Sequence, residues 1–256
     1  MKPPKISIVI PSYNKVRFIG QTLSSIFNQN YPNLEVIIQD GGSTDGTVDI
    51  IREFAKKNKI IWVSKKDNGQ LDAINKGFKK ATGKILTFIN ADDVYAKESF
   101  YQVVKAYKNN SNALWFAGKG TVINSKGMEI AKSVTLYKNL LLSLNSRYWL
   151  LTTNYLIQPS VFITKKAYKN LGNFTGTKNF VMEYDSWLKL SKKQMPVIIN
   201  KDLSKFRIES ATKTKTMSKD LLNEDWKIVN RYTKSSIILT MHKFNNLTRL
   251  IVEKFV

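Results

Sequence analysis

The chain has 256 residues, and 43% of them are hydrophobic, which is enough for a substantial core in one large domain or two small ones. It has no cysteine and one histidine, His242, so disulfides, thiolate metal sites and cysteine nucleophiles are excluded, and acid–base chemistry falls to Asp, Glu or Lys. The net charge is +22, and residues 97–200 carry half of it with 15 basic and 4 acidic residues, which favours an anionic partner.

The first ninety residues alternate between short apolar runs and segments with helical periodicity. The apolar runs predict strands at 6–10, 34–38, 60–63 and 85–89, and the periodic segments predict helices at 18–27, 48–57 and 72–81. Strands that alternate with helices in this way predict an α/β fold, in which an open, mostly parallel sheet is covered by helices on both faces.

Each of these four predicted strands is followed by a polar cluster. The clusters are Tyr13-Asn14, Asp40, Asp67-Asn68 with Gln70, and Asn90 with Asp92 and Asp93. Ligands of an open α/β sheet bind outside the carboxyl ends of its strands, so we expect the four clusters to meet along one edge.

The cluster Asn90-Ala-Asp-Asp93 is the strongest metal candidate. Two adjacent carboxylates at the end of a buried strand repel each other unless a cation or hydrogen-bond donors compensate them. Oxygen ligands of this kind suit Mg²⁺ or Mn²⁺. The alternative is a plain turn in which Asp93 caps a helix that begins near Ala96.

The glycine-rich loop Asp40-Gly-Gly-Ser-Thr-Asp-Gly46 does not have the spacing of a dinucleotide fingerprint, and the sequence contains no P-loop motif. One interpretation is a turn in which Ser43 or Thr44 caps the next helix. The other, which we favour, makes Asp40 an acceptor for a base or ribose.

The first hundred residues resemble the family 2 glycosyltransferases, which have the GT-A fold, a Rossmann-like nucleotide-diphospho-sugar transferase fold. The resemblance rests on Ile8-Val-Ile-Pro-Ser-Tyr-Asn14, Gln39-Asp-Gly-Gly-Ser-Thr-Asp-Gly-Thr47, Lys66-Asp-Asn-Gly-Gln70, Asp72-Ala-Ile-Asn-Lys-Gly77, Ala81-Thr-Gly-Lys84 and Phe88-Ile-Asn-Ala-Asp-Asp93, in the family's order and spacing. It implies that the first half binds a nucleotide sugar and that Mg²⁺ or Mn²⁺ bridges the diphosphate to the acidic motif.

The resemblance also implies roles for individual residues. Nucleotide-sugar binding is expected of Pro11, Tyr13, Asn14, Asp40, Asp67, Gln70, Asp72, Asn90, Asp92 and Arg207. Tyr13 lies against the base, and the metal is expected on Asp92 and Asp93. One departure from the pattern is Asn90, where many members of the family have Asp. The resulting metal site has one negative charge fewer.

In the second half, we expect a helix at 100–107, strands at 114–118 and 121–123, and a hairpin turn at 125–127. The apolar stretch 140–151 predicts either a core-packing helix, which we favour, or a membrane contact. No signal peptide opens the sequence, and no apolar run suffices to span a bilayer. We therefore expect a cytoplasmic protein that is soluble or peripheral on the cytoplasmic face of the membrane.

Residues 158–190 resemble the acceptor side of the same family, where a carboxylate at the start of a helix is the catalytic base. The matching position is Glu183, and Asp185 is the second catalytic candidate. Residues 183 and 187 share a helix face and 185 points elsewhere, so Glu183 and Trp187 are predicted to line an acceptor pocket while Asp185 supports the loop. Alternatively, Glu183 is only a favourable acid near a helix N-terminus.

The last part of the chain resembles the family less closely. Phe206–Lys213 resembles a segment in which an Arg and a following His reach toward the diphosphate, with Arg207 at the first position and Glu209 at the second. Residues 237–256 place Ile237, Met241, Phe244, Leu247, Ile251 and Phe255 on one stripe of a basic helix. Such a helix lies either on an acidic membrane or over the core of the domain.

These observations predict a glycosyltransferase domain over residues 1–215, with a nucleotide-sugar half (1–96), an acceptor half (97–215) and a helical extension (216–256). The expected reaction inverts the donor sugar, with a glycan or lipid-linked acceptor in cell-surface polysaccharide assembly. The alternatives are a sugar nucleotidyltransferase and a non-enzymatic basic protein that binds membrane or nucleic acid. Pro11–Asn14 in place of a glycine-rich basic loop argues against the nucleotidyltransferase. The acids at the strand ends argue against the basic binding protein, so we expect no nucleic-acid partner.

Overall fold

The structure is a computed structural model that describes residues 2–175, 182–208 and 218–253. Within these ranges, eight strands form one sheet in the order β3-β2-β1-β4-β7-β6-β8-β5. The strands are β1 (Ile6–Ser12), β2 (Leu34–Asp40), β3 (Ile60–Ser64), β4 (Ile85–Phe88), β5 (Val94–Tyr95), β6 (Trp115–Ile123), β7 (Val161–Thr164) and β8 (Val197–Arg207).

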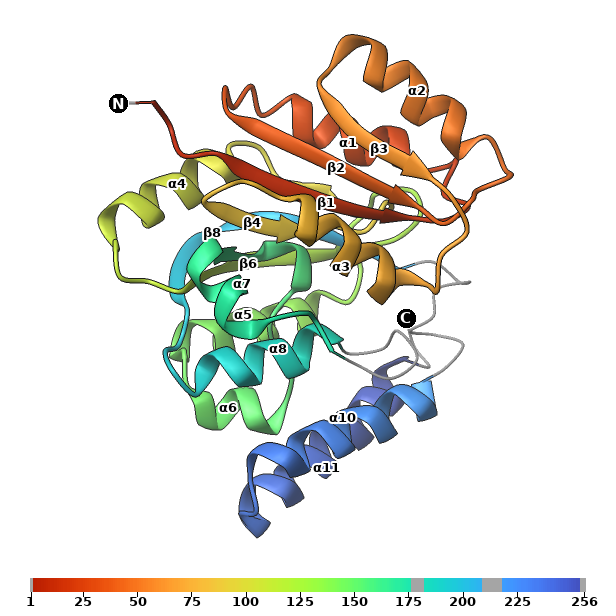
Figure 1. Cartoon of the computed structure of the whole chain (residues 1–256). Helices are drawn as coiled ribbons and strands as arrows, with labels where there is room; N and C mark the ends of the chain where they lie inside the picture. The colour runs from red at the N-terminus through yellow and green to blue at the C-terminus, as the bar shows by residue number, and fades with distance from the viewer. Residues whose placement is uncertain (1, 176–181, 209–217, 254–256) are drawn as a thin grey trace.

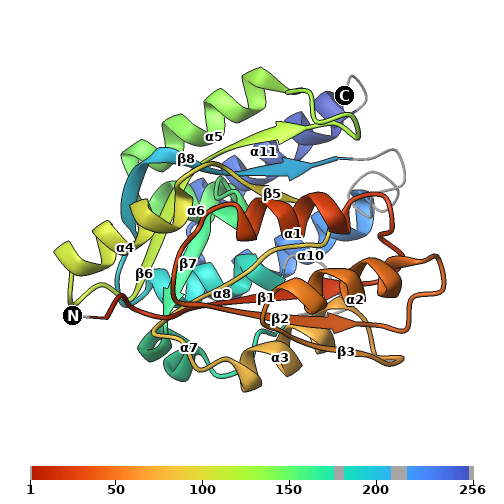
Figure 2. The same ribbon diagram turned by 90° about the horizontal axis from the view of Figure 1, so that it is seen from above.

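Helices cover both faces of this sheet (Figures 1 and 2). They are α1 (Ile19–Phe27), α2 (Thr47–Lys57), α3 (Gln70–Lys80), α4 (Ser99–Asn109), α5 (Lys132–Leu144), α6 (Arg147–Thr152), α7 (Lys165–Leu171), α8 (Met182–Ser191), α10 (Ser218–Tyr232) and α11 (Ser236–Glu253), with a 3-10 turn at Gln158–Ser160. The predicted α/β fold with a helical C-terminal region is confirmed.

The amino-terminal half of the sheet is parallel, and the rest is mixed. Strands β3, β2, β1 and β4 run parallel to one another. Strand β7 lies antiparallel between β4 and β6, whereas β8 returns parallel to β6. Because the apolar runs of β1, β2 and β4 are buried on both faces, their hydrophobic residues are nearly continuous rather than alternating.

Two apolar layers stabilise the two faces of the sheet. Val9 and Ile37 point to the layer formed with α3, α5, α6, α7, α8 and α10. Ile8 and Ile38 point to the opposite layer, formed with α1, α2 and α4. The period of two along each strand therefore divides its side chains between two cores, which fixes the register of the parallel strands.

Strand β6 corrects the prediction of two separate strands at 114–118 and 121–123. The glycines between them do not end the strand but shift its register against β8 on either side of Lys119. A Cβ at Gly118 would lie 2.3 Å from Leu203 Cδ1, and one at Gly120 would lie 2.9 Å from Ile157 Cγ2. Glycine is needed here because the side chains of other segments pack directly on the β6 backbone.

The predicted helix over 140–151 is two helices, α5 and α6, which meet at Asn145. Asn145 has a φ of +44°, the left-handed conformation that ends α5. Ser146 then begins α6, and its side chain accepts a hydrogen bond from the Tyr148 N–H at 3.2 Å. Leu141 and Leu142 of α5 and Leu150 and Leu151 of α6 are buried, as expected of the core-packing interpretation.

The C-terminal helices α10 and α11 pack on α6 and α8 at the far end of the molecule from α2 (Figure 1). Three side chains of the apolar stripe predicted for α11, those of Ile237, Phe244 and Leu247, are exposed and do not face the core. Phe255, at the end of that stripe, lies outside the described residues. The helix instead packs through Ile238 and Leu239, which contact the core layer, and the buried His242. Among the described residues, no helix has the length and hydrophobicity needed to span a membrane.

Candidate functional site

The loops that follow β1 and β2 are joined by hydrogen bonds. The Asn14 N–H donates to Ser43 Oγ at 2.8 Å, and the Thr44 N–H donates to Asn14 Oδ1 at 3.0 Å. Asn14 adopts a φ of +48°, which turns the chain sharply after Pro11 at the end of β1. The ring of Tyr13 is left 62% exposed at this edge.

Asp40 organises the loop that follows its own strand. Its carboxylate accepts hydrogen bonds from the Gly42 N–H, from the N–H and hydroxyl of Ser43, and from the Ser64 hydroxyl, at 2.6–3.1 Å. The residue is 2% exposed. Its oxygens are therefore occupied inside the protein, where they connect the loop after β2 to the end of β3.

The loop after β3 approaches the loop after β2 closely. A Cβ at Gly41 would lie 3.2 Å from Asp67 Oδ1, so only glycine fits there without displacing the carboxylate. Asp67 also accepts a hydrogen bond from the Gly69 N–H at 2.8 Å, which shapes the turn into α3. Asp72, in the first turn of α3, forms an ion pair with Lys76 at 2.6 Å, and this hydrogen bond lowers the pKa of its carboxyl.

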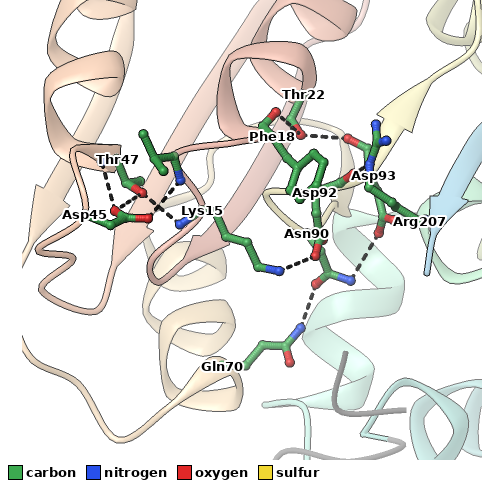
Figure 3. Close-up of polar contacts among 11 residues, drawn as sticks. Lys15, Phe18, Thr22, Asp45, Thr47, Gln70, Asn90, Asp92, Asp93 and Arg207 are labelled. Atoms are coloured by element: carbon green, nitrogen blue, oxygen red, sulfur yellow. Dashed lines mark hydrogen bonds and ion pairs between the residues drawn. The ribbon is translucent and has the colours of Figure 1, made fainter. Parts of the chain in front are cut away.

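Two contacts connect the turn after β4 to the other loops (Figure 3). Gln70 Nε2 donates to Asn90 Oδ1 at 2.6 Å, and Lys15 Nζ lies 2.6 Å from Asp92 Oδ2. The loops after β1, β2, β3 and β4 therefore form one rim at the carboxyl ends of the parallel strands, as the pattern of polar clusters predicts. We call this edge the rim below.

The two adjacent carboxylates of the rim have different surroundings. Asp93 is completely buried, and its carboxylate accepts hydrogen bonds from the Arg207 N–H at 2.7 Å and from Asn90 Nδ2 at 3.1 Å. Burial, and then the neighbouring charge of Asp92, raises the pKa of the Asp93 carboxyl well above its usual value. Asp93 does not cap a helix near Ala96, since α4 begins at Ser99.

Arg207 contacts the turn Asn90–Asp93, the acidic turn, from the protein interior. This position differs from the expected reach toward a diphosphate. Its side chain is buried and stacks over the Phe18 ring at 4.7 Å. The guanidinium donates to the Asp92 carbonyl at 2.7 Å, to the carbonyls of Asn124 and Ser125, and to Gln21 Oε1 at 2.9 Å. Glu209, expected beside it, lies outside the described residues.

The rim offers one carboxylate that can bind a divalent cation. In the part of the chain that the structure describes, no three acidic or histidine side chains gather in the manner of a self-sufficient metal site. Both oxygens of Asp93 are engaged inside the protein, so Asp92 is the carboxylate available there. A Mg²⁺ ion commonly binds one or two carboxylates together with substrate phosphates and water, and this set satisfies that minimum.

On the acceptor side, α8 carries Glu183 and Asp185 in its first turn. Glu183 is half-buried, and Figure 1 shows the amino end of α8 on the same side of the molecule as the carboxyl ends of β1 and β2. Asp185 is buried and accepts hydrogen bonds from Thr175, Arg231 and Tyr232 at 2.8–3.0 Å. Asp185 thus connects α8 to α10, which agrees with the supporting role expected of it.

Trp187 differs from the expected acceptor platform. Its indole is 2% exposed and stacks on Trp115 with ring centroids 5.6 Å apart. Phe174 packs edge-on against it at 6.3 Å. The ring belongs to the core and offers no face to a sugar, because helix periodicity gives the face of a side chain but not what covers that face.

Lys15, the cation that pairs with Asp92, is not among the site residues predicted from the sequence. The residue follows the polar turn after β1, and its backbone N–H donates to Thr47 Oγ1 at 2.8 Å. Its side chain is 29% exposed, so the ion pair lies at the open edge of the rim. An unpaired acidic cluster in a parallel sheet needs a compensating cation, and a lysine next to a neighbouring strand end is a detectable candidate.

The family model and the related proteins that match this sequence all describe glycosyltransferases. The sequence model of glycosyl transferase family 2 matches residues 7–172. An uncharacterized glycosyltransferase of Rickettsia bellii (strain RML369-C) is 26% identical over 96% of this chain and 33% of its own length. The putative teichuronic acid biosynthesis glycosyltransferase TuaG of Bacillus subtilis (strain 168) is 33% identical over 45% of this chain and 46% of its own length.

Solved structures support the fold. S. aureus TarS 1–349, in complex with UDP-GlcNAc, has a TM-score of 0.68 at 18% identity over 89% of this chain and 66% of that chain. The mannosyltransferase PcManGT of Pyrobaculum calidifontis, in complex with GDP-Man and Mn²⁺, also has a TM-score of 0.68 at 18% identity, over 93% and 68%. The chain spans about a third of the length of three Rickettsia relatives it matches and 77% of the length of a fourth, from Rickettsia prowazekii (strain Madrid E). Since the family model covers well over half of the sequence and most of the sheet, the chain belongs to glycosyl transferase family 2.

Proposed function

We propose that the chain transfers a sugar from a nucleoside-diphosphate sugar to a hydroxyl group with inversion at the anomeric carbon. The observation that carries the proposal is the rim. There, hydrogen bonds and an ion pair join the loops after four parallel strands around Lys15 and Asp92, whose side chains are 29% and 12% exposed. Membership of family 2 supports it, as do the nucleotide sugars named for TarS and PcManGT.

The donor binds along the rim. The exposed ring of Tyr13 offers a stacking surface for the base, and the loop that Asp40 and Asn14 hold in place surrounds the nucleoside. Gln70 and Asn90 lie next to each other between α3 and the acidic turn, where their amides can hydrogen-bond the donor sugar. Asp67 and Pro11 act by shaping these loops.

Asp92 is the residue that would hold Mg²⁺ or Mn²⁺. When bound, such an ion neutralises the negative charge that develops on the leaving diphosphate. Lys15 competes for the same carboxylate, so we expect its ammonium to move from Asp92 toward the phosphates when the donor arrives. Arg207 and Asp93 position Asp92 from the protein interior and do not touch the donor.

Glu183 is the proposed catalytic base. Its carboxylate takes the proton of the acceptor hydroxyl while the hydroxyl oxygen bonds to the anomeric carbon and the bond to the diphosphate oxygen breaks. Because attack comes from the face opposite the leaving group, the configuration inverts. Asp185 is the weaker candidate, since three hydrogen-bond donors occupy its carboxylate.

The acceptor is proposed to be a glycan or a lipid-linked sugar in cell-surface polysaccharide assembly. The name of TuaG, a putative teichuronic acid biosynthesis enzyme, supports this class. The excess of positive charge in residues 97–200 suits an acceptor that carries phosphates or carboxylates.

A donor screen followed by a turnover assay tests the proposal. UDP-, GDP- and dTDP-sugars are added with Mn²⁺, and the melting temperature is recorded, because a ligand that binds only the native state raises its stability. With the donor that binds, Glu183→Gln should retain the thermal shift while sugar transfer falls by about two orders of magnitude or more. Glu53→Gln, an exposed acid of α2, is the matched control and should keep both. Equal turnover of Glu183→Gln and wild type would remove Glu183 from the role of base.

A further inference from the structure

Helices α5 and α11 each expose a stripe of large apolar side chains. On α5 the stripe is Leu136, Leu140 and Leu144, spaced by four residues, and on α11 it is Ile237, Phe244 and Leu247. Their exposed fractions lie between 53% and 72%. Contiguous exposed apolar surface is uncommon in monomeric soluble proteins and marks an interaction site. We call these six side chains the apolar face.

Hydrogen bonds link α11 to both α5 and α6. Tyr137 of α5 donates to Asn245 Oδ1 of α11 at 3.3 Å, and Asn245 Nδ2 donates to the Thr152 carbonyl at the end of α6 at 3.1 Å. Tyr148 of α6 contacts Met241 Sδ at 2.9 Å.

The inner side of α11 explains why its apolar stripe faces outward. His242 is 1% exposed, and its Nδ1 lies 3.2 Å from the Leu151 carbonyl. The same ring stacks parallel to Tyr184, with centroids 6.5 Å apart. The buried side of α11 thus combines His242 with the apolar Ile238 and Leu239, and a second apolar stripe is exposed. A helix that only covers its own core would have a polar outer side.

The charges along α5, α6 and most of α11 have one sign. The sequence contains no Asp or Glu between Glu129 and Glu183, or between Asp225 and Glu253, and these two stretches include α5, α6 and nearly all of α11. Lys132 and Lys243, exposed on α5 and α11, flank the stripes. A second copy of this chain would oppose positive charge to positive charge, whereas an anionic lipid surface complements both the charge and the apolar side chains.

We propose that the apolar face of α5 and α11 docks on an anionic lipid bilayer, with Leu140, Phe244 and their neighbours in the interface and the lysines among the headgroups. The helices lie on the bilayer and do not cross it. This inference does not rest on sugar transfer, and its readout is lipid binding.

Co-sedimentation with vesicles tests the docking. The 256-residue chain is mixed with vesicles of phosphatidylcholine alone or with phosphatidylglycerol at a third of the lipid. The wild type should sediment with the anionic vesicles. The double variant Leu140→Gln/Phe244→Gln should have about a hundredfold lower affinity for them, since burial of each large apolar side chain contributes roughly tenfold. Lys132→Gln with Lys243→Gln should weaken binding roughly fivefold for each lysine, and high salt should remove that difference.

Ile61→Thr with Val63→Thr is the matched control, because these side chains are 41% and 37% exposed on the edge strand β3. This variant should bind anionic vesicles like the wild type. Hydrogen exchange tests the wild type without any substitution. Anionic vesicles should slow the exchange of backbone amides in α5 and α11 but not in α2. Failure of the wild type to sediment, or equal binding by the Leu140/Phe244 variant, would overturn the proposal. If the wild type forms dimers and does not bind vesicles, and if only the Leu140/Phe244 variant dissociates those dimers, the face is instead an interface between copies.

Discussion

At the scale of single residues, most charged groups near the rim hold the protein together rather than face a ligand. Asp40, Asp93 and Arg207 are each nearly or fully buried, and their polar atoms bind backbone and side-chain partners. The chemistry is left to partly exposed groups, chiefly Lys15 and Asp92. A rigid inner set of this kind is what keeps a few reactive side chains in place.

Replacing Arg207 should therefore destabilise the fold. Arg207→Met removes the guanidinium donor from the carbonyls of Asp92, Asn124 and Ser125, and we expect a loss of about 3 kcal/mol in the free energy of unfolding. Urea denaturation measures it. Arg52→Met, an exposed arginine of α2, should change stability by less than about 0.5 kcal/mol. Equal effects of the two substitutions would contradict the inner role of Arg207.

Glu35 gives the fold a defined pH dependence. Burial alone would raise the pKa of this carboxyl, but hydrogen bonds from Ser7 and Thr82, aided by the charge of Lys5, lower it below its ordinary value of 4.5. The folded state thus binds its proton less readily than the unfolded state. The stabilisation is present above pH 4.5 and is lost as the pH falls through the lowered pKa.

Glu35→Gln should consequently cost about 1 kcal/mol at pH 7, with the difference from wild type shrinking below pH 4.5. Unfolding curves at pH 7, 5, 4 and 3 measure this dependence. A difference that stays constant over the whole range would show that the charge of Glu35 contributes nothing.

At the scale of elements, Asp185 is the connection between α8 and α10. Its carboxylate accepts hydrogen bonds from Arg231 at 3.0 Å and Tyr232 at 2.8 Å, both in the last turn of α10. In Asp185→Ala, amide exchange in α10 should accelerate about tenfold or more, while α1 stays unchanged. Asp202→Ala, an exposed acid of β8, serves as the control. If α10 exchanges at the wild-type rate, this connection does not stabilise it.

The elements of the first half were predictable because each apolar run lies between local breakers and three of its four strands, β1, β2 and β4, are buried on both faces. Strand β6 was not, because Gly118 and Gly120 are required by contacts with Leu203 and Ile157, which are distant in sequence. Similarly, the split between α5 and α6 depends on the left-handed Asn145, which an apolar pattern does not reveal.

The site was predictable in its location but less so in its assignments. Polar residues at four strand ends do lie on one rim, because parallel topology brings strand ends together. Sequence alone does not say whether a carboxylate faces a ligand or its own loop, and Asp40 and Asp92 differ in this respect. Trp187 and the apolar stripe of α11 show the same gap, since periodicity does not identify the partner of a helix face.

At the scale of the whole molecule, one sheet connects the rim to the acceptor side. Strand β7 joins the parallel half at β4 to the second half at β6, and residues of β4 and α8 share one core layer. The turn that carries Asp92 and the helix that carries Glu183 are therefore attached to one core. The apolar face lies on helices packed against that core. Under our two proposals, a soluble donor binds at the rim while α5 and α11 rest on an anionic surface.

The most direct test of the account is the metal-dependent affinity for a nucleoside diphosphate, measured by titration calorimetry with UDP and GDP, with and without Mn²⁺. Wild type should bind one of them at least about tenfold more tightly with Mn²⁺, equivalent to about 1.4 kcal/mol. Asp92→Asn should lose that gain, Lys15→Met should reach it at lower Mn²⁺ concentration, and Asp49→Asn, an exposed acid of α2, should behave like wild type. The same gain from Mn²⁺ in Asp92→Asn as in wild type would contradict the account.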